Sequence, residues 1–180
     1  MKTNSAETRL IYDTAPLTEN IEVTGHPIIN MLVSSTANDG DFFVYLEDVA
    51  PDGTSTMVSD GLLRASFAGL YSEDTIVPGN FDVKPALPWH GFATAQRNDT
   101  VFADSAQVEL RIDLMPTSWV FRQGHRIRVA IAGADWPTFV LHPLLSPENN
   151  PDAGSNIVPT ISVHRTDAAL SYIQLPIIND

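Results

Sequence analysis

The stretch SWVFRQGHRIRVAIAGADWPT, residues 118–138, decides the fold. After Gln123 and Gly124, apolar side chains alternate with polar or small ones through RIRVAIA, residues 126–132. A period of two is typical of a strand with one face in a core. Gly124 allows a positive φ ahead of this strand, and Pro137 cannot continue a β-ladder beyond it. The stretch therefore predicts a tight turn followed by a half-buried strand.

The preceding segment VELRIDL, residues 108–114, shows the same alternation. Two such strands with a short connection are typical of neighbours in an antiparallel sheet. We therefore expect Glu109 or Asp113 to lie opposite Arg126 or Arg128, in exposed pairs that fix register more than stability.

Short strands of this kind recur along the chain and are separated by Gly- and Pro-rich turns, whereas no segment has a convincing helical period. We expect strands at 21–23, 27–36, 42–49, 54–58, 62–67, 160–164 and 171–177, with turns at 37–41, 50–53 and 60–61. Pro176 marks the last of these as an edge strand. The pattern predicts an all-β protein, a β-sandwich or jelly roll.

Composition limits the classes of function. A chain of 180 residues with 43% hydrophobic and 18% charged residues is long enough for one domain with a sizeable core. The net charge of −12 repels nucleic acid and anionic membranes at long range. There is no cysteine, and no run approaches the roughly 18 apolar residues of a membrane span. These features favour a cytoplasmic protein that binds neither nucleic acid nor membrane.

Two segments lack periodicity, residues 68–104 and residues 142–159, and both are rich in proline. A connection of that length in a compact domain usually has a function or its own packing. The first contains Trp89, His90 and Phe92, which we interpret as a candidate docking or cleft surface. Trp119 and Trp136 flank the best strand and are better explained as core residues.

No catalytic or metal site is evident. The nucleophile elbow G-x-S-x-G is absent, so we expect no catalytic residues in this chain. The histidines at positions 26, 90, 125, 142 and 164 show no zinc-binding spacing, and we expect no cofactor. His125, beside Gly124, is interpreted as a turn residue hydrogen-bonded to backbone. The segment NDGD, residues 38–41, is interpreted as a turn because it lacks the bidentate glutamate of a calcium loop.

Several motifs together resemble one family. GHRIRVAIAGADWP preceded by LMPTSWVF is similar to the signature of the C-terminal β-sandwich of the CocE/NonD hydrolases, a group that includes X-Pro dipeptidyl-peptidases, cocaine esterase and α-amino acid ester hydrolases. LIYDTAPLTENIEVTG, the segment from MLVSS to LRASF, LPWHGF and VHRTDAALSYIQLPII follow the same order. The resemblance covers nearly everything from Leu10 to Ile178.

The resemblance implies a galactose-binding-like jelly-roll β-sandwich that is not catalytic. In such enzymes the catalytic triad lies in a preceding α/β-hydrolase domain, against which the sandwich packs to shape the substrate cleft and oligomer contacts. We therefore expect residues 10–180 to form one accessory domain of a serine hydrolase acting on esters or X-Pro peptides. The partner would be an α/β-hydrolase domain in the same or a separate polypeptide.

The chain also departs from the family pattern at its start. The family's sandwich begins upstream of the position matched by Leu10, whereas residues 1–9 here are polar and expected to be disordered or tag-like. The chain would then lack the family's first strands, as a fragment or a short gene product, and an open edge invites a homo-oligomer. A free-standing carbohydrate-binding jelly roll is the alternative, on the analogy of the fold alone.

Overall fold

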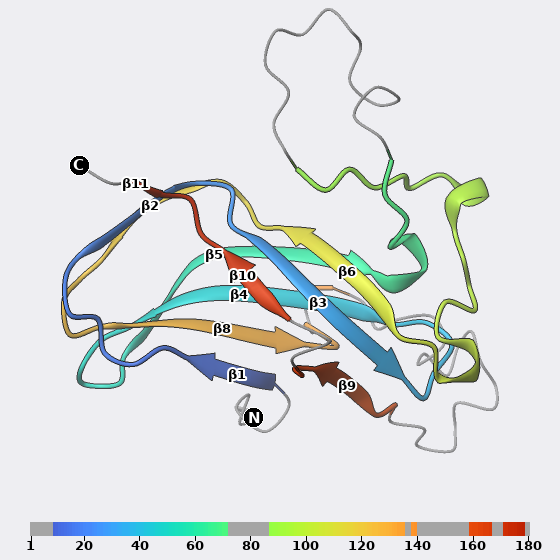
Figure 1. Ribbon diagram of the computed structural model, residues 1–180, viewed down its shortest axis with the longest axis horizontal. Helices are drawn as coiled ribbons and strands as arrows, with labels where there is room; N and C mark the ends of the chain where they lie inside the picture. The colour runs from blue at the N-terminus through green and yellow to red at the C-terminus, as the bar shows by residue number, and fades with distance from the viewer. Residues whose placement is uncertain (1–8, 72–86, 136–137, 140–158, 167–170, 179–180) are drawn as a thin grey trace, which may run out of the picture.

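The computed structural model describes residues 9–71, 87–135, 138–139, 159–166 and 171–178. Within these residues the chain forms strands and short 3-10 turns (Figure 1). The strands are β1 (Arg9–Asp13), β2 (Ile21–Gly25), β3 (Ile28–Ser35), β4 (Asp41–Val49), β5 (Ser55–Arg64), β6 (Val108–Asp113), β7 (Thr117–Phe121), β8 (Arg126–Ala132), β9 (Ile161–His164), β10 (Tyr172–Gln174) and β11 (Ile177–Ile178). The 3-10 turns are η2 (Ala65–Phe67), η3 (Thr94–Gln96) and η4 (Ala103–Ser105).

All strand pairs are antiparallel, and they form two layers. One layer is the four-stranded sheet β1-β8-β4-β5. The other contains β10-β3-β6, with β9 also on β3, followed by β11-β2-β7. Figure 1 looks down on the layers, with β3 and β10 crossing over β4 and β8. The predicted all-β sandwich is confirmed.

A line of prolines divides the second layer. Its three chains run side by side twice, first as β10, β3 and β6 and then as β11, β2 and β7. Pro27, Pro116 and Pro176 lie at the three interruptions. A proline donates no ladder hydrogen bond, so strands on both sides of such a line pair separately. The carbonyls of Pro27 and Pro176 still accept from the backbone N–H of Leu114 and Thr24, at 2.8 and 3.0 Å, and so keep the two parts joined.

The core fills the space between the layers. Its members are the inward-facing residues of both layers, among them Val23, Met31, Val44, Leu46, Leu110, Ile112, Phe121, Ile127 and Val129. Trp119 is half-buried and packs against this core, as predicted. Trp136 and nearly all of the predicted loose N-terminus and of the second irregular segment lie outside the described residues.

A buried carboxylate connects the two layers. Asp48 of β4 is 6% exposed and accepts hydrogen bonds from Trp119 Nε1 of β7 at 3.0 Å and from His125 Nδ1 at 2.7 Å. His125 is a turn residue hydrogen-bonded to backbone, as expected, since its N–H donates to the Arg122 carbonyl at 3.0 Å and its carbonyl accepts from the Leu17 N–H at 2.8 Å. The additional bond of its side chain to Asp48 was not predicted. The register that places Asp48 opposite Ile127 brings the carboxylate within reach of the imidazole.

The two alternating strands of the sequence are not neighbours, contrary to expectation. β6 pairs with β3, whereas β8 pairs with β1 and β4 in the other layer. Arg128 therefore binds Asp13, and Arg126 donates to the Thr14 carbonyl at 2.7 Å. Alternation reports which face of a strand is buried, but it does not identify the partner strand.

The predicted turn at Asp60 and Gly61 is also wrong, because β5 runs through it without a break. Gly61 marks a close approach instead. A Cβ built there would lie 2.6 Å from the carbonyl oxygen of Asp113, and the neighbouring backbone is almost as near. The glycine lets β5 pack directly against the end of β6.

We predict that Gly61→Ala destabilises the fold by about 1–3 kcal/mol, because the obstacle is backbone and cannot rotate away. The free energy of unfolding from urea titration is the measurement. Gly69→Ala is the control, since an added Cβ there meets nothing within 4 Å. Equal stabilities of the two variants would contradict this packing argument.

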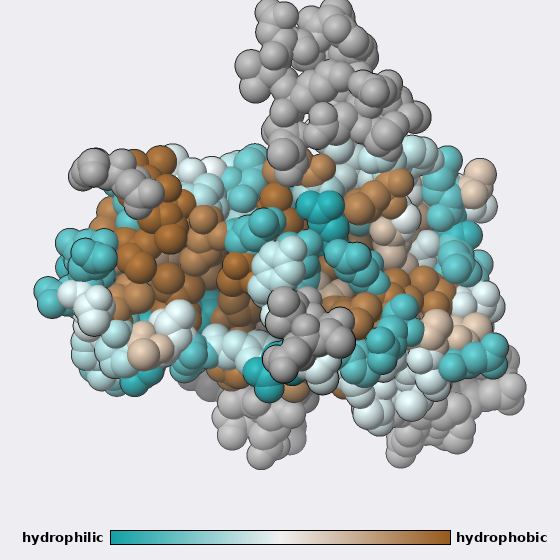
Figure 2. All heavy atoms as spheres, viewed as in Figure 1, coloured by the Kyte–Doolittle hydropathy of each residue, from teal (hydrophilic) through white to brown (hydrophobic). Residues whose placement is uncertain are grey.

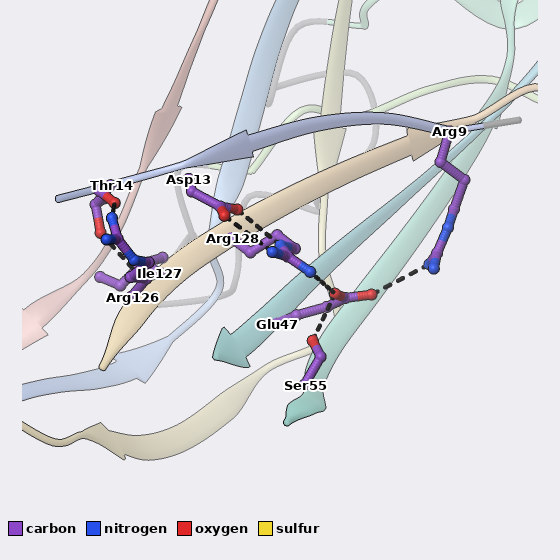
Figure 3. Close-up of polar contacts among 8 residues, drawn as sticks. All are labelled: Arg9, Asp13, Thr14, Glu47, Ser55, Arg126, Ile127 and Arg128. Atoms are coloured by element: carbon purple, nitrogen blue, oxygen red, sulfur yellow. Dashed lines mark hydrogen bonds and ion pairs between the residues drawn. The ribbon is translucent and has the colours of Figure 1, made fainter. Parts of the chain in front are cut away.

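Charged side chains on the outer face of the first layer tie β1 to the sheet (Figure 3). Arg128 of β8 forms a bidentate pair with Asp13, at 2.7 and 2.9 Å. Its guanidinium also lies 3.9 Å from Glu47 of β4, which accepts from Arg9 at 3.2 Å and from Ser55 at 2.7 Å. The network therefore spans the four strands β1, β8, β4 and β5 and fixes the register of the edge strand β1. The Arg128 hydrogen bond lowers the pKa of Asp13 below its usual 3.8.

A lowered folded-state pKa adds stability above the unfolded value, and this contribution is lost as the pH falls through the folded value. We therefore predict that Asp13→Asn lowers the urea midpoint at pH 7, by an amount equivalent to about 0.2–1 kcal/mol for this largely exposed pair. The difference from wild type should shrink as the pH falls below 3.8 and through the lowered pKa of Asp13, because the carboxylate is then protonated. Glu19→Gln, which removes an exposed carboxylate, is the matched control. A difference that persists in acid would show that the ion pair is not responsible.

Candidate docking surface

Trp89, His90 and Phe92 lie in one short segment that follows the edge formed by β5 and β6. The segment pairs with the chain that leaves η2. His90 forms an antiparallel bridge with Leu70, and the Tyr71 N–H donates to the Trp89 carbonyl at 2.8 Å. The irregular segment of the sequence therefore has defined backbone partners here.

His90 anchors this segment to the second layer. Its Nε2 lies 2.7 Å from the Arg111 carbonyl oxygen on β6, and its Nδ1 lies 3.3 Å from the Gly69 carbonyl oxygen. A neutral imidazole donates from one nitrogen only, and the shorter contact places that hydrogen on Nε2. The hydrogen bond from Nε2 to the Arg111 carbonyl is therefore the contact that positions the ring.

Phe92 is the most exposed aromatic side chain among the described residues, at 67%. Its ring lies 5.5 Å from Phe67 and 6.4 Å from His90, centroid to centroid. Leu62 and Leu70, both close to half exposed, belong to the same region of the chain's surface. Exposed apolar side chains that gather in this way are typical of an interaction site.

A groove of about 190 Å³ runs beside these rings. Its lining, here called the aromatic groove, consists of Leu62, Leu63, Leu87, Pro88, Trp89, His90, Phe92, Ile112 and Asp113. Trp89 Nε1 is buried and has no hydrogen-bond partner among the described residues. A buried unpaired N–H is costly, and a carbonyl of a bound partner is the group that would relieve the cost.

A second exposed apolar cluster was not predicted. Ile178 and Val120 flank Glu22 on one face of the sheet β11-β2-β7, and both are nearly half exposed. Figure 2 shows the brown surface over the end where β2 and β11 lie. The signal in the sequence was the pair Ile177 and Ile178, because consecutive residues of a strand cannot both face one core.

Two histidines among the described residues have partners of the kind found in a catalytic triad, but they lie in different places. Asp48 orients His125 at the β7–β8 turn, and Ser34 Oγ lies 2.9 Å from His164 Nε2 on β3 and β9. Nucleophilic catalysis needs hydroxyl, base and orienting acid in one chain of contacts. Within the described residues no contact connects the two pairs.

The other motifs of the sequence have structural roles. Asp39, in the calcium-like segment, accepts from the backbone N–H of Gly40 and of Ser66, each at 2.8 Å, as a turn residue does. In the described part of the chain there is no cluster of three acidic, histidine or cysteine side chains suited to a metal ion, and no helix long and apolar enough to cross a membrane.

Comparison with known proteins agrees with the resemblance seen in the sequence. The family model described as "X-Pro dipeptidyl-peptidase C-terminal non-catalytic domain" matches residues 2–157. A protein of Mycobacterium bovis named as a serine esterase is 38% identical over 169 residues, which are 94% of this chain and 24% of that protein. The cocaine esterase of a Rhodococcus species is 30% identical over 178 residues, 94% of this chain and 25% of the enzyme.

Solved structures agree on the fold. A CocE/NonD family hydrolase from Staphylococcus aureus superimposes with a TM-score of 0.68 at 18% identity, over 96% of this chain and 31% of that one. At this identity the likeness concerns the fold alone. The chain spans about a quarter of the length of the two esterases that it matches in sequence.

We predict that His90→Phe, which keeps a ring but removes both carbonyl contacts, loosens the segment that carries the aromatic groove. Amide hydrogen exchange at Tyr71, whose N–H binds the Trp89 carbonyl, should become faster. The loss of stability should be about 1 kcal/mol, the net value of an ordinary hydrogen bond. His164→Phe, on the opposite edge of the sandwich, should leave Tyr71 exchange unchanged. Equal exchange in wild type and His90→Phe would contradict the anchoring role.

Proposed function

The chain belongs to the family of X-Pro dipeptidyl-peptidase C-terminal non-catalytic domains, and we propose that it serves as the accessory domain of a larger serine hydrolase. The observation that carries this proposal is the coverage: nearly the whole chain matches only about a quarter of each esterase. On this proposal the remaining three quarters supply the α/β-hydrolase domain with its nucleophile, base and acid. The chain contributes binding surface and takes no part in bond breaking.

We further propose that the aromatic groove is the face that packs on the catalytic domain and helps to wall its substrate cleft. Phe92, Leu62 and Leu70 present apolar surface that has no partner within the described chain. The unpaired Trp89 N–H adds a directional donor in the same place. Buried aromatic anchors with a polar neighbour are the usual centre of a protein–protein interface.

The names of the relatives suggest a substrate class for the whole enzyme. The matched proteins are named for ester hydrolysis, so we propose an ester hydrolase, with an X-Pro peptidase as the neighbouring possibility within the family. Residues 10–180 would act as one domain, and the exposed Ile177 and Ile178 are available for contact between copies. Self-association through that end follows from the proposal but is separate from docking.

We predict that Phe92→Ala and Trp89→Ala each raise the Kd for a separately produced catalytic domain by about tenfold or more, as truncation of an interface anchor does. Surface plasmon resonance measures the Kd, and the thermal melt of each variant checks its fold. Val120→Ala, a matched apolar truncation on the other exposed cluster, should change the Kd by less than about twofold. Unchanged Kd values for both aromatic variants would rule out the aromatic groove as the docking face.

A further inference from the structure

The sandwich is open between its layers along one edge. A cavity of about 240 Å³ enters there, with β1 and β8 on one side and β3, β9 and β10 on the other. Two short strands share this edge of β3 and leave a gap. β10 pairs with residues 28–30 and β9 with residues 32–35, so Met31 lies between them with no ladder partner on that side among the described residues. The opening is therefore a consequence of the strand register.

The inner wall of this cavity is aliphatic. Ile29 and Met31 contribute from one layer, and Val129 and Ile131 contribute from the other. The hydroxyl of Ser171 also reaches the wall, but it already accepts from the Leu32 N–H and donates to the His164 carbonyl. The interior therefore offers a ligand apolar contact and little hydrogen bonding.

The mouth carries a positive charge. The Arg165 guanidinium lies 4.6 Å from the centre of the Tyr12 ring and lines the same cavity. No carboxylate of the described residues pairs with it. A stacked guanidinium keeps its edge N–H groups available, and their planar geometry matches a carboxylate.

From this geometry we propose that the edge cavity binds a small apolar monocarboxylate, such as a short fatty acid or an aromatic acid. The tail would lie between the layers and the carboxylate would bind Arg165. Size agrees with this class, since an apolar cavity of about 150 Å³ is enough to bind benzene. This site is separate from the aromatic groove, which is lined by other residues, so the inference does not depend on the proposed docking.

The test uses the 180-residue chain labelled with ¹³C on its methionine methyl groups. The sequence has four methionines, of which Met31 lines the cavity while Met57 and Met115 lie exposed elsewhere. Titration with octanoate should move the Met31 resonance in a saturable way and leave the Met57 and Met115 resonances in place. No Met31 shift at millimolar octanoate, or equal shifts at all three methyl groups, would overturn the proposal.

The role of the charge needs a second comparison. Arg165→Gln should raise the Kd for octanoate about tenfold, as loss of a charge-assisted hydrogen bond does. Arg122→Gln, at an exposed position outside the cavity, should leave the Kd unchanged. The neutral analogue octanol should bind wild type and Arg165→Gln alike and more weakly than octanoate binds wild type. Octanol and octanoate binding with the same affinity would overturn the assignment of a carboxylate ligand.

Discussion

The structure depends on one buried carboxylate, that of Asp48. A charge held at 6% exposure is costly unless it is fully paired, and here the indole of Trp119 and the imidazole of His125 provide the pairing. Trp119 belongs to one layer and Asp48 to the other. These two hydrogen bonds therefore fix how β7 crosses over β4 and where the turn after β7 leads the chain into β8. The residues that most clearly mark the family in the sequence are thus donors to a carboxylate about seventy positions earlier.

The sequence period predicted the strands well because it depends only on local alternation. It could not predict which strands are neighbours, since the pairing of β8 with β1 and β4 joins residues far apart in the sequence, such as Val49 with Arg126 and Asp13 with Arg128. Gly61 illustrates the same limit. A glycine after an aspartate is typical of a turn, yet here it is required by the backbone of β6 across the sandwich. Local propensity gave way to tertiary packing at that position.

The candidate site was predicted in part. Loss of periodicity and the presence of aromatic residues pointed to residues 89–92, and the exposure of Phe92 agrees with that interpretation. The carbonyl contacts of His90 could not be predicted, because backbone acceptors leave no trace in the side-chain pattern. The edge cavity was missed for a related reason: it results from the gap between β9 and β10 at Met31, which is a matter of register.

The distribution of charge separates the surfaces of the domain. The outer face of β1, β8 and β4 carries a charged network in which Glu47 pairs with both Arg9 and Arg128 (Figure 3). Covering that face with a partner would require desolvating charges whose bonds are already made. The aromatic groove lies beyond β5, where the apolar side chains of Phe92 and Leu62 are exposed and can be covered by a partner at little such cost. Because desolvation costs less at the groove than at the network, this distribution of charge supports the proposed docking on the β5–β6 side over docking on the outer face of β1, β8 and β4.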